Sequence, residues 1–452
     1  MNKWIPAAIG AAVVVALSAG AWYSGLRAEQ AFTEELAKVN AGPALKLELG
    51  SYDRGWFRSH GTVKVSLSDP SFAGENDGAP VLFEQPFTVV HGPILWDSAF
   101  AFRPAAFGIK SVLDAQPDWP QDFKTILADE RVRLTAHVGF GGSTSTRLRI
   151  AEGDLQLSNG KLDLQRGDMV VDYDPSDKAM SANFAWPGFV FTSEMGELKV
   201  EDMGFDWAGT YYSQNVQIGE GSYHINRISA KQGEMEAFVM NAMKITGKQN
   251  LDSSGEKVSS AVDMSLDQVN FLGQEMVKNG SLHLELNNLS MAALQKLDQL
   301  NPAAMTPEQM ETVFADVMAL SQHGAELRID PLKADIQGQP FSLQLVAKLP
   351  QQAADAVVDP MQLFAQAEAD LNISVSPQLI AAWAPAEFAG FADDQGKVVV
   401  QLRQGQILVN GQPYTPGSED SAYSGDETES LDWAEQEVLE AEAAGYQTDE
   451  AI

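Results

Sequence analysis

The stretch 155–165, LQLSNGKLDLQ, holds two short runs in which apolar and polar residues alternate. Successive side chains of a β-strand point to opposite faces, so alternation with a period of two predicts half-buried strands. Asn159-Gly160 separates the two runs, and this dipeptide is the strongest short signal for a two-residue hairpin turn. The stretch therefore predicts an antiparallel hairpin.

The same alternation recurs on both sides of this hairpin and dominates the chain. Further strands are predicted around Leu45-Leu47-Leu49, Val63-Val65-Leu67, Val132-Leu134, Leu148-Ile150, Leu198-Val200, Met240-Met243-Ile245, Leu282-Leu284-Leu286, Ile329, Phe341-Leu343-Leu345, Leu371-Ile373-Val375, Val398-Val400-Leu402 and Ile407-Val409. No strict repeat of 20–50 residues is present, so a solenoid is not predicted. We expect an α+β fold with β predominant, built on an elongated, curved antiparallel sheet or on two stacked sheets.

Helical patterns interrupt the strands in one region. Apolar residues recur every three positions from Met291 to Leu300. Thr306-Pro307-Glu308-Gln309 then supplies an N-cap, a proline in the first turn and a capping-box glutamine. These signals predict a helical hairpin over 291–322, inserted in the β-rich body, and a shorter helix is expected over 377–383.

An uncharged apolar segment lies near the N-terminus. Residues 5–26 contain no charged side chain, and at about 1.5 Å per residue they would form a helix of ~33 Å, enough to cross a hydrocarbon core of ~30 Å. Pro6 suits the first turn of a helix, and interfacial aromatics bracket the segment. The predicted membrane-anchor residues are Trp4, Pro6, Trp22 and Tyr23.

The charges around this segment predict its orientation. Lys3 precedes it and Glu29 follows it, so the positive-inside rule predicts a cytoplasmic stub of residues 1–4 and a single-pass, N-in topology. The alternative is a cleavable signal peptide, because Ala19-Gly20-Ala21 fits a cleavage site. The uncharged run is longer than the usual apolar core of a signal peptide, which favours the anchor.

Acidic residues dominate the composition, with 62 Asp and Glu against 30 Lys and Arg. Twelve of the acidic residues lie in 417–452, which holds no Lys or Arg, and this composition predicts a disordered acidic tail. A β-rich domain is expected over 27–416. A subdivision near 187 is the alternative, because Trp186-Pro187-Gly188 is expected to interrupt the strands. The charge balance argues against nucleic-acid binding.

Motifs for known chemistry are missing from the sequence. The chain has no cysteine, which excludes thiolate nucleophiles and iron–sulfur clusters. The six histidines show no zinc-binding spacing, and nothing in the sequence supports a cluster of His60, His91 and His137. The run 172–177 starts like a calcium loop but lacks the glycine at its sixth position, so a turn with surface carboxylates is expected. We predict no cofactor, no metal and no catalytic residue.

Two segments stand out as candidate structural or interaction motifs. The first, SYDRGWFRS over 51–59, joins the first two predicted strands, and its glycine would allow a sharp turn or bulge between aromatic and cationic side chains. Its candidate residues are Tyr52, Arg54, Gly55, Trp56, Phe57 and Arg58. The second segment ends a strand with His91, Gly92 and Pro93. Both fit a structural role, and the first would also suit a lipid headgroup or a partner.

With these motifs in this order, the chain resembles the YdgA-like (YdgA/YihF) family of bacterial envelope proteins, which carry a domain of unknown function. The resemblance rests on the end of the anchor at 20–25, on 52–59, on His91-Gly92-Pro93 and on the closing Val409-Asn410-Gly411-Gln412-Pro413. It covers roughly residues 1–416. It implies a protein anchored in the inner membrane of a Gram-negative bacterium with its body in the periplasm, and it brings no catalytic residues.

Three functions are compatible with these features. The first is non-enzymatic binding of lipid or a hydrophobic ligand, or a role in envelope assembly, because a curved sheet has one apolar face that must be filled. The second is a protein-interaction scaffold that uses the sheet edges or the acidic tail. The third, glycan hydrolysis, would need an Asp/Glu pair in a cleft. The expected partners are the inner membrane and, for the body, lipid or envelope proteins.

Overall fold

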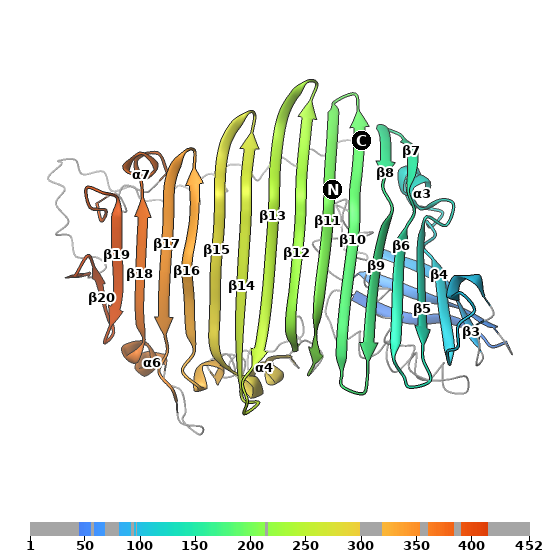
Figure 1. Ribbon diagram of the computed structural model, residues 1–452, viewed down its shortest axis with the longest axis horizontal. Helices are drawn as coiled ribbons and strands as arrows, with labels where there is room; N and C mark the ends of the chain where they lie inside the picture. Colours follow the sequence, from blue (N-terminus) through green and yellow to red (C-terminus); the bar gives the residue numbers. More distant parts are fainter. Residues whose placement is uncertain are drawn as a thin grey trace, which may run out of the picture. The chain divides into compact units, whose positions relative to one another are not determined.

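Every strand of the described structure belongs to one antiparallel sheet (Figure 1). The structure is a computed structural model that describes residues 45–55, 58–67, 81–91, 95, 97–212, 216–298, 319–352, 360–383 and 390–414. Contacts between residues divide the chain after Pro413, and the unit described below is the first of the two. The predicted anchor 5–26, the helix expected after Thr306 and the acidic tail 417–452 lie outside the described residues.

The described strands are long in the middle of the sheet and shorter at its edges. They are β1 (Leu45–Asp53), β2 (Arg58–Leu67), β3 (Val81–His91), β4 (Phe107–Val112), β5 (Val132–Val138), β6 (Thr144–Ile150), β7 (Gly153–Leu157), β8 (Gly160–Leu164), β9 (Gly167–Asp174), β10 (Ala179–Ser193), β11 (Gly196–Tyr211), β12 (Gln217–Gln232), β13 (Met235–Leu251), β14 (Lys257–Phe271), β15 (Gln274–Ser290), β16 (Glu326–Ile336), β17 (Gln339–Lys348), β18 (Glu368–Val375), β19 (Lys397–Arg403), β20 (Gln406–Val409) and β21 (Gln412–Pro413). The helices are η2 (Ser98–Phe100), α3 (Gln121–Leu127), α4 (Met291–Asp298), η4 (Leu320–Gln322), α6 (Pro360–Gln366) and α7 (Pro377–Trp383).

Consecutive strands pair with each other along almost the whole sheet. The β7–β8 hairpin is the exception, because β6 pairs with β9, while β8 and β9 lie one after the other along β10. All these pairings are antiparallel. The described chain therefore forms one meander. Side chains of neighbouring strands lie next to one another and form rows that cross the sheet.

One such row is apolar across thirteen strands, and we call it the apolar ladder. Its members are direct cross-strand partners, and directly opposed residues of an antiparallel pair share a face. The apolar ladder consists of Leu134, Leu148, Met169, Phe184, Phe205, Tyr223, Ile245, Met264, Leu282, Leu332, Leu343, Ile373 and Val398. Only Leu134 and Val398, at its two ends, are buried.

The opposite face of the same strands is polar. Each ladder residue from β10 onward has a neighbour in sequence that points the other way, and these neighbours form a row of small, hydroxyl and cationic side chains. The row is Ala185, Gly204, His224, Lys244, Ser265, Ser281, Lys333, Ser342, Ser374 and Lys397. The sheet therefore has one apolar and one polar face, as the alternation predicts.

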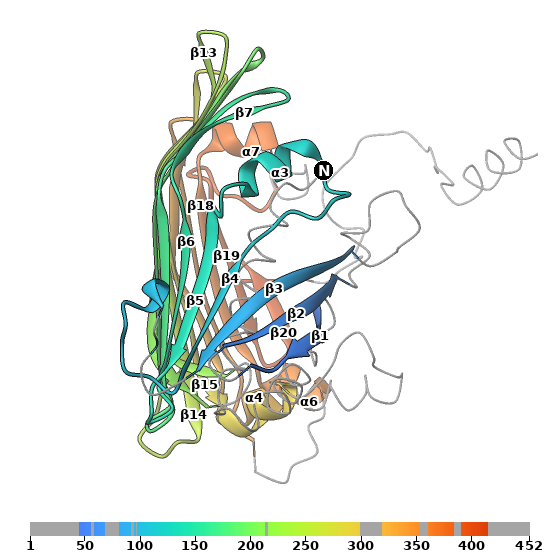
Figure 2. The same cartoon turned by 90° about the vertical axis from the view of Figure 1, so that its right-hand side faces the viewer.

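The described α-helices lie on the apolar side. Figure 2 shows α3, α4, α6 and α7 on one side of the sheet, near the two ends of the strands. Met291 of α4 packs in a cluster with Val258, Leu289 and the half-buried Leu286, and Leu286 shares a strand and a face with the ladder residue Leu282. The helices thus cover parts of the apolar face.

The most deeply buried core is formed by side chains of the N-terminal strands. It is built by Val63, Val65, Phe87, Val89, Phe107, Ile109, Leu134, Ala136 and Val138 from β2 to β5. Val65 and Ile109 have no exposed surface. These strands carry the two candidate motifs, so the motifs are attached to the most deeply buried part of the described chain.

Several predictions made from the sequence are confirmed. The strand-rich antiparallel architecture, the hairpin at Asn159-Gly160 and the helix over 377–383 are all present. Of the predicted helical hairpin, the structure describes α4 at its start and η4 at its end. Among the described residues no helix is long and apolar enough to span a membrane, and the predicted anchor falls outside them.

One interpretation of the sequence is wrong. Trp186-Pro187-Gly188 does not interrupt the strands, because β10 runs through all three residues and pairs with β11 on both sides of them. Pro187 is tolerated there because the facing Asp202 has a left-handed backbone (φ 51°) and Gly188 has φ 116°, so the ladder of hydrogen bonds is locally irregular.

Candidate functional site

The first motif occupies the link between β1 and β2. The bulge expected near Arg54-Gly55 lies earlier, at Gly50, where the pairing of β1 with β2 shifts by one residue. Residues 54–57 connect the strands instead. A Cβ on Gly55 would collide with the carbonyl oxygen of Arg58, so this link requires glycine.

Folding brings the two candidate motifs together. Arg58 and Ser59 begin β2, which pairs with the end of β3, where His91 lies. The hydroxyl of Ser59 and Nε2 of His91 are 2.7 Å apart and share a hydrogen bond. The two segments that the sequence singled out separately therefore form one site, which we call the motif junction (residues 52–55, 58, 59 and 91, with Asp97 and Lys110).

The Ser59–His91 pair has the atoms of a nucleophile and its base, but the Ser59 hydroxyl is not accessible to a substrate. The Ser59 side chain is completely buried, with 0% of its surface exposed. A substrate would have to reach this hydroxyl to be attacked. The pair therefore acts as a buried cross-strand contact between β2 and β3.

The surroundings of His91 favour its neutral form. Burial first, and then the positive charge of Arg54, lower the pKa of His91 below its ordinary value. Protonation consequently favours the unfolded state, in which the pKa of histidine is about 6.5. The stability contributed by neutral His91 is fully present above that pH and is lost as the pH falls below it.

We predict that His91→Gln makes the protein less sensitive to acid below about pH 6.5. The measurement is the urea midpoint of unfolding at each pH for wild type and variant. His283→Gln supplies the control of opposite sign, because hydrogen bonds with Asp263 and then Glu285 raise the pKa of His283. Parallel pH profiles for wild type and His91→Gln would contradict the prediction.

Asp97 is a member of the motif junction that the sequence did not reveal. Its carboxylate accepts hydrogen bonds from Lys110 Nζ at 2.7 Å and Arg58 Nη2 at 3.2 Å, and it caps the N-terminus of η2 through Ala99 N at 3.0 Å. Burial alone would raise the pKa of Asp97, but the hydrogen bonds and the two positive charges outweigh it and lower the pKa. Arg58 is thus tied to the loop that follows β3.

Tyr52 supports the junction from the core side. Its ring lies 6.3 Å from that of Phe87, centroid to centroid, and packs against the buried cluster of β2 to β5. Its hydroxyl is buried and finds no hydrogen-bond partner among the described residues. The ring therefore contributes mainly apolar contact, as expected for an aromatic residue of this motif.

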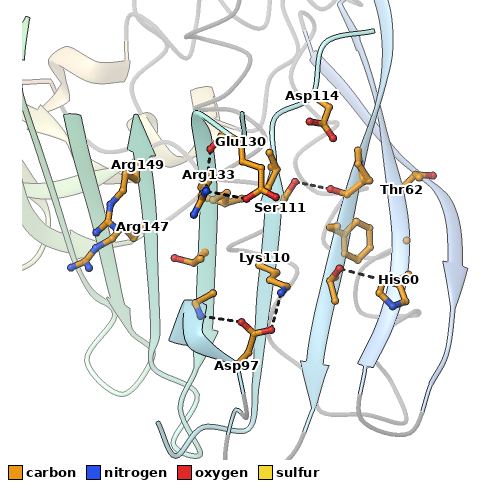
Figure 3. A pocket seen from close by; sticks show the side chains of 18 of the residues that line it. His60, Thr62, Asp97, Lys110, Ser111, Asp114, Glu130, Arg133, Arg147 and Arg149 are labelled. Atoms are coloured by element: carbon orange, nitrogen blue, oxygen red, sulfur yellow. Dashed lines mark hydrogen bonds and ion pairs between the residues drawn. The ribbon is translucent and has the colours of Figure 1, made fainter. Parts of the chain in front are cut away.

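A pocket of about 880 Å³ opens beside the junction on the polar face. Figure 3 shows Asp97 beside Lys110, with His60 on one side of this pair and Arg147 and Arg149 on the other. The pocket also contains the carboxylates of Asp53, Asp114 and Glu130. Polar and apolar surface contribute about equally to its lining, and the charged side chains within it would suit an ionic ligand.

The described residues contain no group of three or more His, Asp or Glu side chains placed to hold a metal ion. His60 contacts Thr88, His91 contacts Ser59 and His137 contacts Arg103, so the structure does not bring the three histidines together. In the run 172–177, Asp174 accepts hydrogen bonds from Ser176 within the turn, which agrees with the expected turn carrying carboxylates.

Comparison with known proteins identifies the family. Residues 1–390 match the model of a family described as "Bacterial protein of unknown function (DUF945)". The chain belongs to the DUF945 family. The match contains the motif junction and most of the apolar ladder, and the resemblance to YdgA-like proteins is confirmed.

Two bacterial relatives support this assignment. Protein YdgA of Escherichia coli K12 is 22% identical over 322 residues, covering 66% of this chain and 62% of its own length. An uncharacterized protein of Haemophilus influenzae is 24% identical over 321 residues, covering 64% of this chain and 84% of its own length. No solved structure matches the chain.

The remaining predicted site residues of this DUF945 chain fall outside the described residues. They are Trp56, Phe57, Gly92 and Pro93 of the two motifs, and Trp4, Pro6, Trp22 and Tyr23 of the predicted anchor. Of the described ones, Tyr52, Gly55, Arg58 and His91 all contribute to the motif junction, while Arg54 acts on His91 through its charge.

Proposed function

We propose that this protein binds lipid, or another long apolar molecule, along the apolar face of its sheet, as a non-enzymatic component of the bacterial envelope. The observation that carries the proposal is the apolar ladder. From Leu148 to Ile373 its side chains are only half-buried or exposed, and Met264 keeps 38% of its surface. A contiguous apolar surface of this kind marks a binding site in a soluble domain.

A second apolar row runs beside the ladder on this face. Its members are cross-strand partners that lie two residues along the strand from the ladder, or three residues in β16, where the pairing is irregular: Val262, Leu284, Ile329, Leu345, Leu371 and Val400. A ligand that lies across the strands would therefore meet apolar side chains continuously over several strands, which suits acyl chains better than a compact ligand.

We also propose the location that this function requires. Residues 5–26 would tether the body to the inner membrane, with residues 27–416 in the periplasm. The support is the uncharged run, its flanking charges and the membership of a bacterial family. A tether would hold the apolar face near a source of lipid.

Two adjacent residues on opposite faces test the proposal. We expect Met264→Glu to weaken binding of a fluorescent fatty acid about tenfold or more, because a carboxylate on the apolar face must be desolvated when the ligand binds. Ser265→Glu is the matched control, since it adds the same charge one residue away on the polar face. Fluorescence titration of the full chain in detergent, with lipid extraction after purification, provides the measurement.

The results separate the proposed function from its alternatives. Saturable binding that Met264→Glu weakens and Ser265→Glu preserves supports an apolar ligand on the ladder. If neither variant changes the affinity, or if the wild-type chain neither binds the fatty acid nor retains lipid, the proposal is wrong. Envelope-protein crosslinks lost only in Met264→Glu would then assign the apolar face to a protein partner.

A further inference from the structure

Three arginines lie on the polar face of the paired strands β5 and β6. Arg133 of β5 lies directly opposite Arg149 of β6, and Arg147 is two residues further along β6 on the same face. Figure 3 shows Arg147 and Arg149 side by side at one side of the pocket, with Arg133 on the adjacent strand. Like charges placed directly opposite each other destabilise a sheet, so this arrangement needs a reason.

The carboxylates around these arginines do not match their number. Arg133 Nη2 lies 3.0 Å from Glu130. Arg149 Nε lies 3.0 Å from Asp168, but Asp168 is shared with Arg166 at 2.9 Å. Arg147 is exposed and, within the described part of the chain, forms no ion pair. Two carboxylates thus pair with three guanidinium groups, and Arg147 adds a fourth positive charge.

The other carboxylates of the pocket leave this imbalance in place. Asp97 is already bound by Lys110 and Arg58. Asp114 lies away from Arg147 and Arg149 in Figure 3, and burial followed by the charge of Glu130 raises its pKa, so its charged form is disfavoured. Asp53 belongs to β1, at the far edge of the pocket from β6.

Arginine is unusually concentrated in this part of the sequence. The chain carries a net charge of −32, yet five of its 12 arginines lie between positions 131 and 166. Arginine is the residue that best matches the geometry of phosphate, because its planar fork of N–H groups binds two oxygens at once. A local concentration of arginine in an acidic protein therefore favours an anionic ligand.

The geometry points to a phosphate-binding site formed by Arg133, Arg147 and Arg149 in the polar-face pocket. A phosphate group between Arg133 and Arg149 would relieve their repulsion, and Arg147 would add a further pair of donors. Thr135, the direct cross-strand partner of Arg147, and Lys110, the partner of Thr135, lie in the same row of residues. Each would donate to the phosphate group or to the molecule that carries it.

This site is independent of the proposed apolar site. Leu148, between the two arginines of β6, belongs to the apolar ladder and points to the other face. One lipid molecule cannot occupy both faces of the sheet at once. The phosphate site therefore stands whether or not the apolar face binds lipid.

The test is calorimetric titration of the full chain, reconstituted in discs of phosphatidylcholine, with two probes. Inorganic phosphate represents the free anion, and glycerophosphoglycerol represents the headgroup of an anionic phospholipid without its chains. We expect saturable binding of one or both that Arg147→Gln weakens about tenfold or more. The control is Lys244→Gln, which removes one positive charge from the polar face of β13, away from the pocket, and should leave the affinity unchanged.

The two probes identify the source of the phosphate group. Preference for glycerophosphoglycerol indicates a lipid headgroup, whereas preference for inorganic phosphate indicates the free ion. Because Arg147 is exposed and forms no ion pair within the described chain, Arg147→Gln should keep the circular dichroism spectrum and the urea midpoint of the wild type. Absence of saturable binding of both probes, or equal weakening by Arg147→Gln and Lys244→Gln, would overturn the assignment.

Discussion

Replacing Gly188 by alanine is expected to lower the free energy of unfolding by about 3–5 kcal/mol. Gly188 has φ 116°, a conformation that residues with a side chain rarely adopt, and its Cβ would collide with the carbonyl oxygen of Val200 on the neighbouring strand. The two strands would have to separate where β10 pairs with β11. Urea unfolding followed by tryptophan fluorescence measures the effect.

A second glycine provides the control for this substitution. Gly247 lies inside β13, its backbone is not left-handed, and a Cβ there would meet no atom within 4 Å. Gly247→Ala should therefore be neutral or slightly stabilising, because alanine loses less backbone entropy on folding. If Gly188→Ala is as well tolerated as Gly247→Ala, the irregular pairing at Pro187 cannot be as tightly constrained as the structure indicates.

Short-range signals account for the part of the fold that was predicted correctly. The Asn159-Gly160 turn, the helix over 377–383 and the alternating strands depend on residues that are close in sequence, and all are present. The interpretation of Trp186-Pro187-Gly188 failed for the opposite reason. Whether a proline ends a strand depends on its partner, and here the partner is Asp202, fifteen residues away, with a left-handed backbone.

The functional features were less accessible to sequence reasoning because they depend on register. Alternation places Met264 and Ser265 on opposite faces, but only the pairing of β14 with β13 and β15 aligns Met264 with Ile245 and Leu282. Similarly, the motif junction exists because β2 pairs with β3, which brings Ser59 to His91. Asp97 carries no distinctive motif, and the one available signal was an Asp-Ser pair suited to cap a short helix.

Asp97→Ala is expected to destabilise the protein by about 2–4 kcal/mol, because one substitution removes a helix cap and two charge-assisted hydrogen bonds. The Asp97 side chain is only 6% exposed, while Arg58 and Lys110 are partly exposed and can turn toward water. The decrease in the free energy of unfolding should therefore be smaller than the cost of leaving a fully buried cation unpaired. Urea unfolding at pH 7 measures it, and a change below about 0.5 kcal/mol, typical of a surface residue, would contradict the prediction.

Asp97→Asn separates the charge of this residue from its role as a cap. Asparagine caps a helix as well as aspartate does, so the variant should retain the bond to Ala99 N and lose the ion pairs with Arg58 and Lys110. Since the pKa of Asp97 is lowered in the folded state, its charge stabilises the fold above the unfolded pKa of about 3.9, and that stability is lost as the pH falls through the folded value. Wild type and Asp97→Asn should therefore differ at pH 7 and converge in acid. A difference that persisted at low pH would show that shape and packing at position 97, rather than its charge, hold Arg58 to the loop after β3.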